Sequence, residues 1–235
     1  MATDPALDIA RSHATLLRVA RGQAGPRPRI YRPAPALAFG RLDTRRPGYD
    51  AAVAAARARG FAPVLRLAGG QAAAYDEQSL VVEQFLGGDD AGGDLHDRFS
   101  DMTTLLADAL RELGVDARVG ELPGEYCPGE HSVNSAGTLK VAGAAQRVVR
   151  GAAMVSAVVV VGHGAAIRDV LVDVYAALEV DWDPATAGSL DEHHPELGID
   201  DVEGAIVGAL GAAAFWRTDP ETEALAADLL ARHAV

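Results

Sequence analysis

The segment VNSAGTLKVAGAAQRVVRGAAMVSAVVVV, residues 133–161, decides the expected fold. It contains no proline, and it carries runs of β-branched residues, which are typical of strands. We therefore predict a strand meander here, with residues 146–149 and 153–161 among its strands. Within it, the most apolar window, 151–162, is too short for a helix that crosses a bilayer, because such a helix needs about 20 residues.

Helices and strands surround this meander in an irregular order. Helices are expected from Pro5, over 49–59, from Ser100 to Gly114, over 167–178, over about 200–210 and over about 219–231. Strands are expected at 30–31, 36–39, 63–67, 79–83 and 115–119, with 63–67 and 79–83 forming a hairpin around a long connection, and a Gly/Asp-rich loop is expected at 87–93. This order predicts an α+β fold with a mixed, largely antiparallel sheet flanked by helices, as a single domain over 1–235.

Composition limits the classes of partner. Of the 235 residues, 49% are hydrophobic, which is enough to bury a substantial core, and the formal net charge is -12. A negative surface repels nucleic acid and anionic membranes, so neither is expected as a partner. Six arginines nevertheless lie close together near the N-terminus and form either a basic patch or a solvated loop: Arg27, Arg29, Arg32, Arg41, Arg45 and Arg46.

Cysteine usage and the N-terminus bear on localisation. Cys127 is the single cysteine, so an intrachain disulfide is excluded and a reducing compartment fits. Asp4 and Asp8 interrupt any apolar leader at the N-terminus. We expect a soluble, cytoplasmic protein.

Lys140 is the one lysine in a chain with twenty arginines. A position that keeps lysine under such a bias either requires a compact ammonium rather than a wide guanidinium, or has kept it by chance. Its neighbours Val141, Ala142 and Gly143 are small, and glycine lets a ligand approach the backbone. We therefore take Lys140 as the candidate catalytic residue.

These residues resemble a known family. The run from Lys140 through Val141 and Gly143 to Gln146 is similar to the catalytic-lysine motif of lipoate-protein ligases and octanoyltransferases. Looser matches follow in the same serial order. They are Phe39-Gly40-Arg41, the loop Arg66-Leu-Ala-Gly69-Gly70-Gln71 with Tyr75, Gly124-Glu-Tyr-Cys127-Pro128 and Gly188-Ser189-Leu190.

The resemblance implies a fold like that of the class II aminoacyl-tRNA synthetases and biotinyl protein ligases, without the extra C-terminal domain that some ligases possess. It also implies acyl transfer, in which lipoate or octanoate is activated as an adenylate with ATP and Mg²⁺ and then attached to a lysine of a lipoyl-domain protein. Acceptors would be the 2-oxoacid dehydrogenase E2 subunit and the glycine cleavage H protein. Lys140 would hold the carbonyl and α-phosphate oxygens. The acyl or adenylate group would contact Arg66, Gly69, Gly70, Gln71, Tyr75, Asn134, Val141 and Gly143.

Two departures from the family pattern leave the acyl donor open. Gln71 replaces the third glycine of the Arg66 loop, and Ser135 follows Asn134 where ligases carry an Asn-Asp pair. An alternative is octanoyl transfer from acyl carrier protein through a cysteine thioester, for which Cys127 is the candidate. In such relatives the nucleophile follows the lysine, so a structural thiol is the favoured interpretation of Cys127. A non-catalytic, lipoyl-binding relative is the third alternative.

Histidines give weaker signals. His193 and His194, with Asp191, Glu192 and Glu196, lack the spacing of zinc ligands, and a polar loop is the better interpretation. His163 ends an apolar strand, where backbone groups usually satisfy the ring. We assign no residue as a metal ligand.

Overall fold

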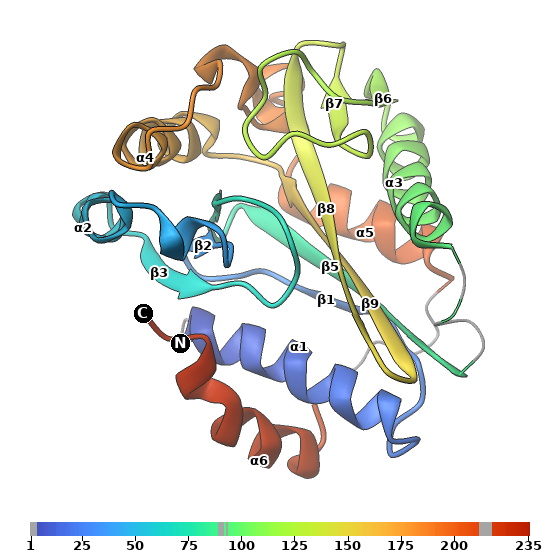
Figure 1. The fold of residues 1–235 in the computed structure, drawn as a ribbon. Coiled ribbons are helices and arrows are strands. Elements are labelled where there is room, and N and C mark those ends of the chain that lie inside the picture. The colour runs from blue at the N-terminus through green and yellow to red at the C-terminus, as the bar shows by residue number, and fades with distance from the viewer. Residues whose placement is uncertain (1–3, 89–91, 93, 212–217) are drawn as a thin grey trace.

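A computed structural model describes residues 4–88, 92, 94–211 and 218–235 of the chain (Figure 1). Most of the loop predicted at 87–93 lies outside the described residues. The helices are α1 (Pro5–Ala20), α2 (Tyr49–Ala58), α3 (Leu95–Glu112), α4 (Gly164–Ala177), α5 (Ile199–Ala209) and α6 (Pro220–Leu229). The strands are β1 (Arg29–Tyr31), β2 (Ala36–Phe39), β3 (Ala62–Leu65), β4 (Ala73–Tyr75), β5 (Ser79–Gly87), β6 (Ala117–Val119), β7 (Val133–Ser135), β8 (Leu139–Val149) and β9 (Ala152–Val160).

The larger sheet has the strand order β1-β5-β9-β8-β7-β6, and each neighbouring pair in it is antiparallel. Its centre is the long hairpin of β8 and β9, in register from Ala142 opposite Val159 to Val149 opposite Ala152. Strand β7 continues the meander on the far side of β8. The meander predicted over 133–161 is confirmed.

The smaller sheet has the order β3-β2-β4. Strand β3 pairs in parallel with β2, and helix α2 lies between them in the chain, as parallel pairing requires a crossover. Strand β5 pairs instead with β1 and β9 in the larger sheet. The predicted hairpin of 63–67 and 79–83 is therefore wrong, because its two strands belong to different sheets and β4 lies between them in the chain.

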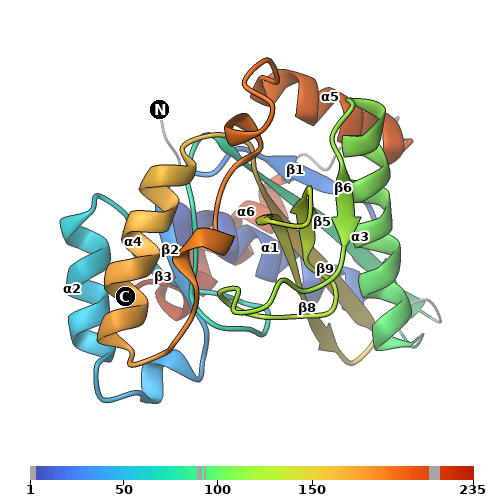
Figure 2. The same cartoon turned by 90° about the horizontal axis from the view of Figure 1, so that it is seen from above.

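Helices cover the sheets in three groups (Figures 1 and 2). Helices α3 and α5 pack together on one face of the larger sheet, over a core that includes Leu106, Leu110 and Val155. Helices α1 and α6 pack against each other beside β5 and β9, and α2 packs on α4 next to the smaller sheet. Among the described residues, no helix combines the length and apolar character needed to cross a bilayer.

Helix α3 starts five residues before the predicted cap at Ser100. Asp94 is the actual N-cap, and its carboxylate accepts the backbone N–H of His96. The first turn does not show the apolar stripe of the later turns, since Leu95 is exposed. The hydrophobic pattern therefore begins later than the helix does.

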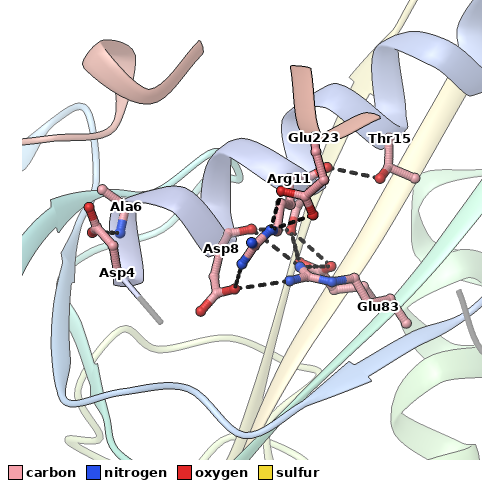
Figure 3. Close-up of polar contacts among 9 residues, drawn as sticks. Asp4, Ala6, Asp8, Arg11, Thr15, Glu83 and Glu223 are labelled. Atoms are coloured by element: carbon pink, nitrogen blue, oxygen red, sulfur yellow. Dashed lines mark hydrogen bonds and ion pairs between the residues drawn. The ribbon is translucent and has the colours of Figure 1, made fainter. Parts of the chain in front are cut away.

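A charge network joins α1, β1, β5 and α6, and its Arg29–Glu83 pair is buried (Figure 3). Arg29 on β1 donates to the Glu83 carboxylate on β5 at 3.1 Å and to the Ser12 hydroxyl on α1 at 2.9 Å. Arg11 on the same helix donates to Glu223 at the start of α6. Burial raises the pKa of Glu83 above its usual range, although the Arg29 charge opposes that rise. The network ties both terminal helices to the edge of the larger sheet.

Candidate active site

A cavity of about 320 Å³ opens between β4, β8, β9 and two loops, 66–72 and 120–132. This volume lies at the lower end of the range for small-molecule sites, about 300–1,000 Å³. Small and apolar side chains form much of its wall, with a few polar groups between them. It is lined by Arg66, Gly69, Gly70, Ala73, Ala74, Phe99, Tyr126, Cys127, Pro128, Gly129, His131, Ser132, Lys140, Gly143, Ala144, Ala145, Gln146, Ser156 and Val158.

Lys140 lies in this wall with its side chain almost fully buried. The ammonium donates to the Glu125 carboxylate at 2.8 Å and to the backbone carbonyls of Tyr126 and Cys127, both at 2.9 Å. Its Nζ also lies 4.7 Å from the centre of the Tyr126 ring. All three N–H donors are thus used, and they hold loop 120–132 in place. Gly143 lies close by, since a Cβ at that position would come within 3.3 Å of Lys140 Cε.

Cys127 lies in the part of loop 120–132 whose backbone carbonyls accept hydrogen bonds from Lys140. Its backbone has φ +43°, a left-handed conformation that is uncommon for a residue other than glycine. The Cys127 N–H donates to the hydroxyl of Tyr175, which in turn donates to the Ala72 carbonyl. Burial raises the pKa of Tyr175 above its usual range, so this phenol stays protonated. The Cys127 Sγ accepts the backbone N–H of Gln71 at 3.2 Å. These contacts direct the sulfur into the cavity wall.

The Gly69-Gly70 loop brings the sulfur and Arg66 together. Gly70 has φ +105°, and a Cβ there would lie 2.9 Å from Arg66 Nη1 and 3.0 Å from Cys127 Sγ. Gly40 in turn packs on the Gly70 carbonyl so closely that no side chain fits. Arg66 closes the loop by donating to the Gln71 carbonyl at 2.8 Å. Glycine at these positions is what allows the close approach.

Arg66 also borders two further cavities. One, of about 60 Å³, continues inward past Tyr75 toward Ser12 and Glu83. The other has a volume of about 390 Å³, and the described residues that line it include no carboxylate. They are His13, Arg41, Thr44, Arg45, Leu65, Arg66, Leu67, Arg147, Arg232 and His233. Two of the six N-terminal arginines therefore contribute to a basic surface, while Arg29 is buried against Glu83.

The structure brings most of the predicted site residues together. Arg66, Gly69, Gly70, Gly143 and Lys140 line the main cavity, and so does Cys127. Gln71 contacts the cavity through its N–H to the sulfur, and Tyr75 lines the small inner cavity.

Two predicted site residues lie elsewhere. Val141 faces the core beneath α3, because neighbours of Lys140 on a strand point to the opposite face. Asn134 donates to the Gly120 carbonyl, and its Oδ1 accepts the Gly137 N–H, so both of its polar atoms serve the adjacent turns.

Sequence reasoning did not single out three residues of this cavity region. Glu125 neutralises Lys140, and His131 and Phe99 are part of the cavity wall. Glu125 was visible as the acidic residue two places before Cys127, whereas nothing in the sequence links Phe99 on α3 to His131. Among the described residues the histidine pair 193–194 is not part of a metal-ligating group: His193 contacts the Ser135 hydroxyl and His194 contacts Glu196.

The sequence profile of the lipoyl protein ligase A/B catalytic domain matches residues 4–211. The chain belongs to this family. An octanoyl-[GcvH]:protein N-octanoyltransferase from Exiguobacterium sibiricum is 34% identical over 143 residues, which are 60% of this chain and 51% of that protein. The chain thus spans about half the length of the curated relatives it matches.

Solved structures show the same fold. A lipoate-protein ligase A bound with ATP superposes with a TM-score of 0.77 at 22% identity, covering 99% of this chain and 92% of that one. A bipartite lipoate protein ligase from Thermoplasma acidophilum, studied with its E2 lipoyl domain, gives 0.72 at 20% identity and covers 97% and 89%. The mixed α+β architecture with a largely antiparallel sheet, expected from the sequence, is confirmed.

Proposed function

We propose that this chain is a protein acyltransferase that attaches an octanoyl or lipoyl group to a lysine of a lipoyl-domain protein through a thioester on Cys127. The proposal rests on the position of the Cys127 sulfur. It lies in the wall of an apolar cavity and accepts a hydrogen bond from the Gln71 N–H. A thiol held in one direction by a backbone N–H, in the wall of a cavity that can hold an acyl chain, is placed to attack the acyl carbonyl. Cys127 precedes Lys140 in the chain, whereas the nucleophile was expected to follow the lysine. This order does not argue against Cys127, because the fold brings residues before and after Lys140 into one cavity.

The relatives support a donor and an acceptor. Their name specifies an octanoyl group carried by GcvH, so we propose the octanoylated glycine cleavage H protein as donor. The T. acidophilum ligase was studied with an E2 lipoyl domain, and we propose such a domain as acceptor. Octanoyl acyl carrier protein is the alternative donor.

The reaction proceeds in two acyl transfers. The sulfur attacks the amide carbonyl of the donor's octanoyl-lysine, the C–N bond breaks, and the thiol proton passes to the departing lysine nitrogen. The acceptor lysine then attacks the thioester carbonyl, the C–S bond breaks, and a proton returns to the sulfur. One amide is consumed and one is formed, so no nucleotide is required for balance.

In this mechanism Lys140 is a positioning residue. Its ammonium holds the Tyr126 and Cys127 carbonyls, and so fixes the bend that presents the sulfur. Glu125 balances the buried charge. The role inferred from sequence, a cation that holds substrate oxygens, would require at least one of these three contacts to open.

Intact-mass measurement tests the proposal. The protein is incubated with octanoylated H protein, and a gain of one octanoyl group that hydroxylamine removes is expected. Because the chain has a single cysteine, a labile adduct of this kind identifies Cys127. Adding an E2 lipoyl domain should discharge the adduct onto the acceptor lysine.

The matched variant is Cys127→Ser, which should show neither adduct nor transfer. Normal transfer by this variant would refute the thioester. An adduct from octanoyl acyl carrier protein but none from H protein would keep the thioester and replace the donor. Binding of a lipoyl domain without transfer from either donor would favour the non-catalytic alternative.

A second candidate function is ATP-dependent ligation through an adenylate. The arginine-lined cavity beside Arg66 favours it, because guanidinium groups bind phosphate oxygens well, and Nε of Arg147 has no partner among the described residues. These arginines would hold the phosphates of ATP, which activates a free acid. Asn134 does not fit a magnesium ligand, since its Oδ1 is engaged by Gly137.

The two candidates separate in one assay. With octanoate or lipoate, ATP, Mg²⁺ and a lipoyl domain, the thioester proposal expects no acylated lysine. ATP-dependent product that persists in Cys127→Ser would overturn the proposal in favour of ligation. Arg147→Ala should then lower that activity.

A further inference from the structure

A group of metal-ligating side chains lies beside the main cavity, and one of them, His131, is part of the cavity wall. His96 belongs to the first turn of α3, and Glu130 and His131 precede β7. Nε2 of His131 lies 3.2 Å from Nδ1 of His96. One ligand atom from each of the three residues falls within 4.8 Å of the other two. The sequence did not suggest this group, because its histidines are 35 positions apart.

The spacing fits a tetrahedral metal. Two imidazole nitrogens bound to zinc at about 2.0–2.1 Å, with a tetrahedral angle between them, lie about 3.3 Å apart. The ring of His131 is stacked on Phe99 at 5.1 Å with an interplanar angle of 11°, which limits its rotation.

We propose that His96, Glu130 and His131 bind a divalent first-row transition metal of the zinc class. Two imidazoles and one carboxylate are a donor set that such ions accept, and the fourth position is left for water. Oxygen-preferring ions such as Mg²⁺ are disfavoured by the two nitrogen donors.

The site has a consequence for the cavity. His131 and Phe99 line its wall, and His131 follows Cys127 by four residues in the loop that Lys140 holds. A metal bound to both His96 and His131 joins this loop to α3. The ion therefore restrains the part of the cavity wall that contains His131, which an acyl-lysine arm must pass to reach the sulfur, and zinc slows acyl transfer. The effect on transfer rests on the proposed function, whereas metal binding does not.

Direct binding is the primary test. Chelator-treated protein is titrated with Zn²⁺ against a chromophoric zinc indicator, and one equivalent per chain is expected. His96→Ala and His131→Ala should each weaken binding by about tenfold or more, and Glu130→Gln by less. His194→Ala is the matched control, since this histidine pairs with Glu196 outside the group, and it should bind as the wild type does.

Cobalt reports the ligand type. Co²⁺ at the proposed site should give tetrahedral visible bands without the near-ultraviolet sulfur charge-transfer band, and Cys127→Ser should leave the spectrum unchanged. A sulfur band that disappears in Cys127→Ser would place the metal on the thiol and overturn the proposal. Unchanged zinc affinity in a folded His96→Ala/His131→Ala double variant would overturn it as well.

Activity gives the last readout. His96→Ala should transfer acyl groups at the wild-type rate in chelator and should lose the inhibition by zinc. Zinc binding with an unaltered transfer rate would refute the gating step alone. A chain that binds zinc as expected but forms no octanoyl adduct would refute the proposed function and leave the metal site standing.

Discussion

Replacing Lys140 by methionine separates the stability of the site from its chemistry. The substitution keeps the length of the apolar stem and removes a buried ammonium, which leaves the fully buried Glu125 carboxylate without its counter-charge. Removing one partner of a buried ion pair costs about 3–5 kcal/mol. Lys140→Met should therefore lower the free energy of unfolding by that amount in urea denaturation at pH 7.

A second substitution completes the test. Glu125→Gln in the Lys140→Met background removes the unpaired charge, so about half or more of the lost stability should return. Acyl transfer should not return, because the carbonyls of Tyr126 and Cys127 still lack their donor. Recovery of both stability and transfer in the double variant would refute the positioning role of Lys140. A loss below about 1 kcal/mol in Lys140→Met would refute the buried pair itself.

Three further predictions follow from the geometry. Gly70→Ala, with its Cβ forced against Cys127 Sγ at φ +105°, should lose about 1–3 kcal/mol of stability and about 100-fold in transfer rate, whereas Gly69→Ala, with no protein atom near its Cβ, should keep its stability. Burial lowers the pKa of His13 to about 4 in the folded state, below the unfolded value, so the unfolded chain binds more protons between pH 4 and 6.5. Stability measured by urea denaturation should therefore fall as the pH drops through this window, by about 1 kcal/mol because the ring is only half buried, and His13→Gln should flatten the profile. Glu83→Ala leaves Arg29 buried without its closest carboxylate and should cost about 3–5 kcal/mol, an effect that Arg29→Met in the same background should partly reverse in thermal unfolding.

Local patterns predicted much of the fold. Residues 133–161 form strands as expected, since β-branched runs without proline have few alternatives, and the helix after Asp4-Pro5 has its Asp4 cap. The false hairpin of 63–67 and 79–83 arose because strand pairing depends on distant contacts, and proximity in the chain was a poor guide to them. Sheet partners can be chosen only when the whole set of strands is in place.

The candidate site could be predicted only in part, because some of its contacts join segments that are distant in the chain. Lys140, Gly70 and Cys127 stood out by residue type or by resemblance, and the fold brings them to one cavity. The contact between His96 and His131 depends on how α3 packs against the 120–132 loop, which no local pattern encodes. Alternation along β8 also explains why Val141, adjacent to the lysine, faces the core instead.

The burial of Lys140 matters for a protein proposed to acylate lysines. The chain has no other lysine, and the side chain of this one is 2% exposed. Its surface therefore presents no side-chain amine that could compete with the acceptor for the acyl group. An acyl-loaded chain has no lysine of its own within reach of a neighbouring copy, so it is protected from modifying itself even at high concentration.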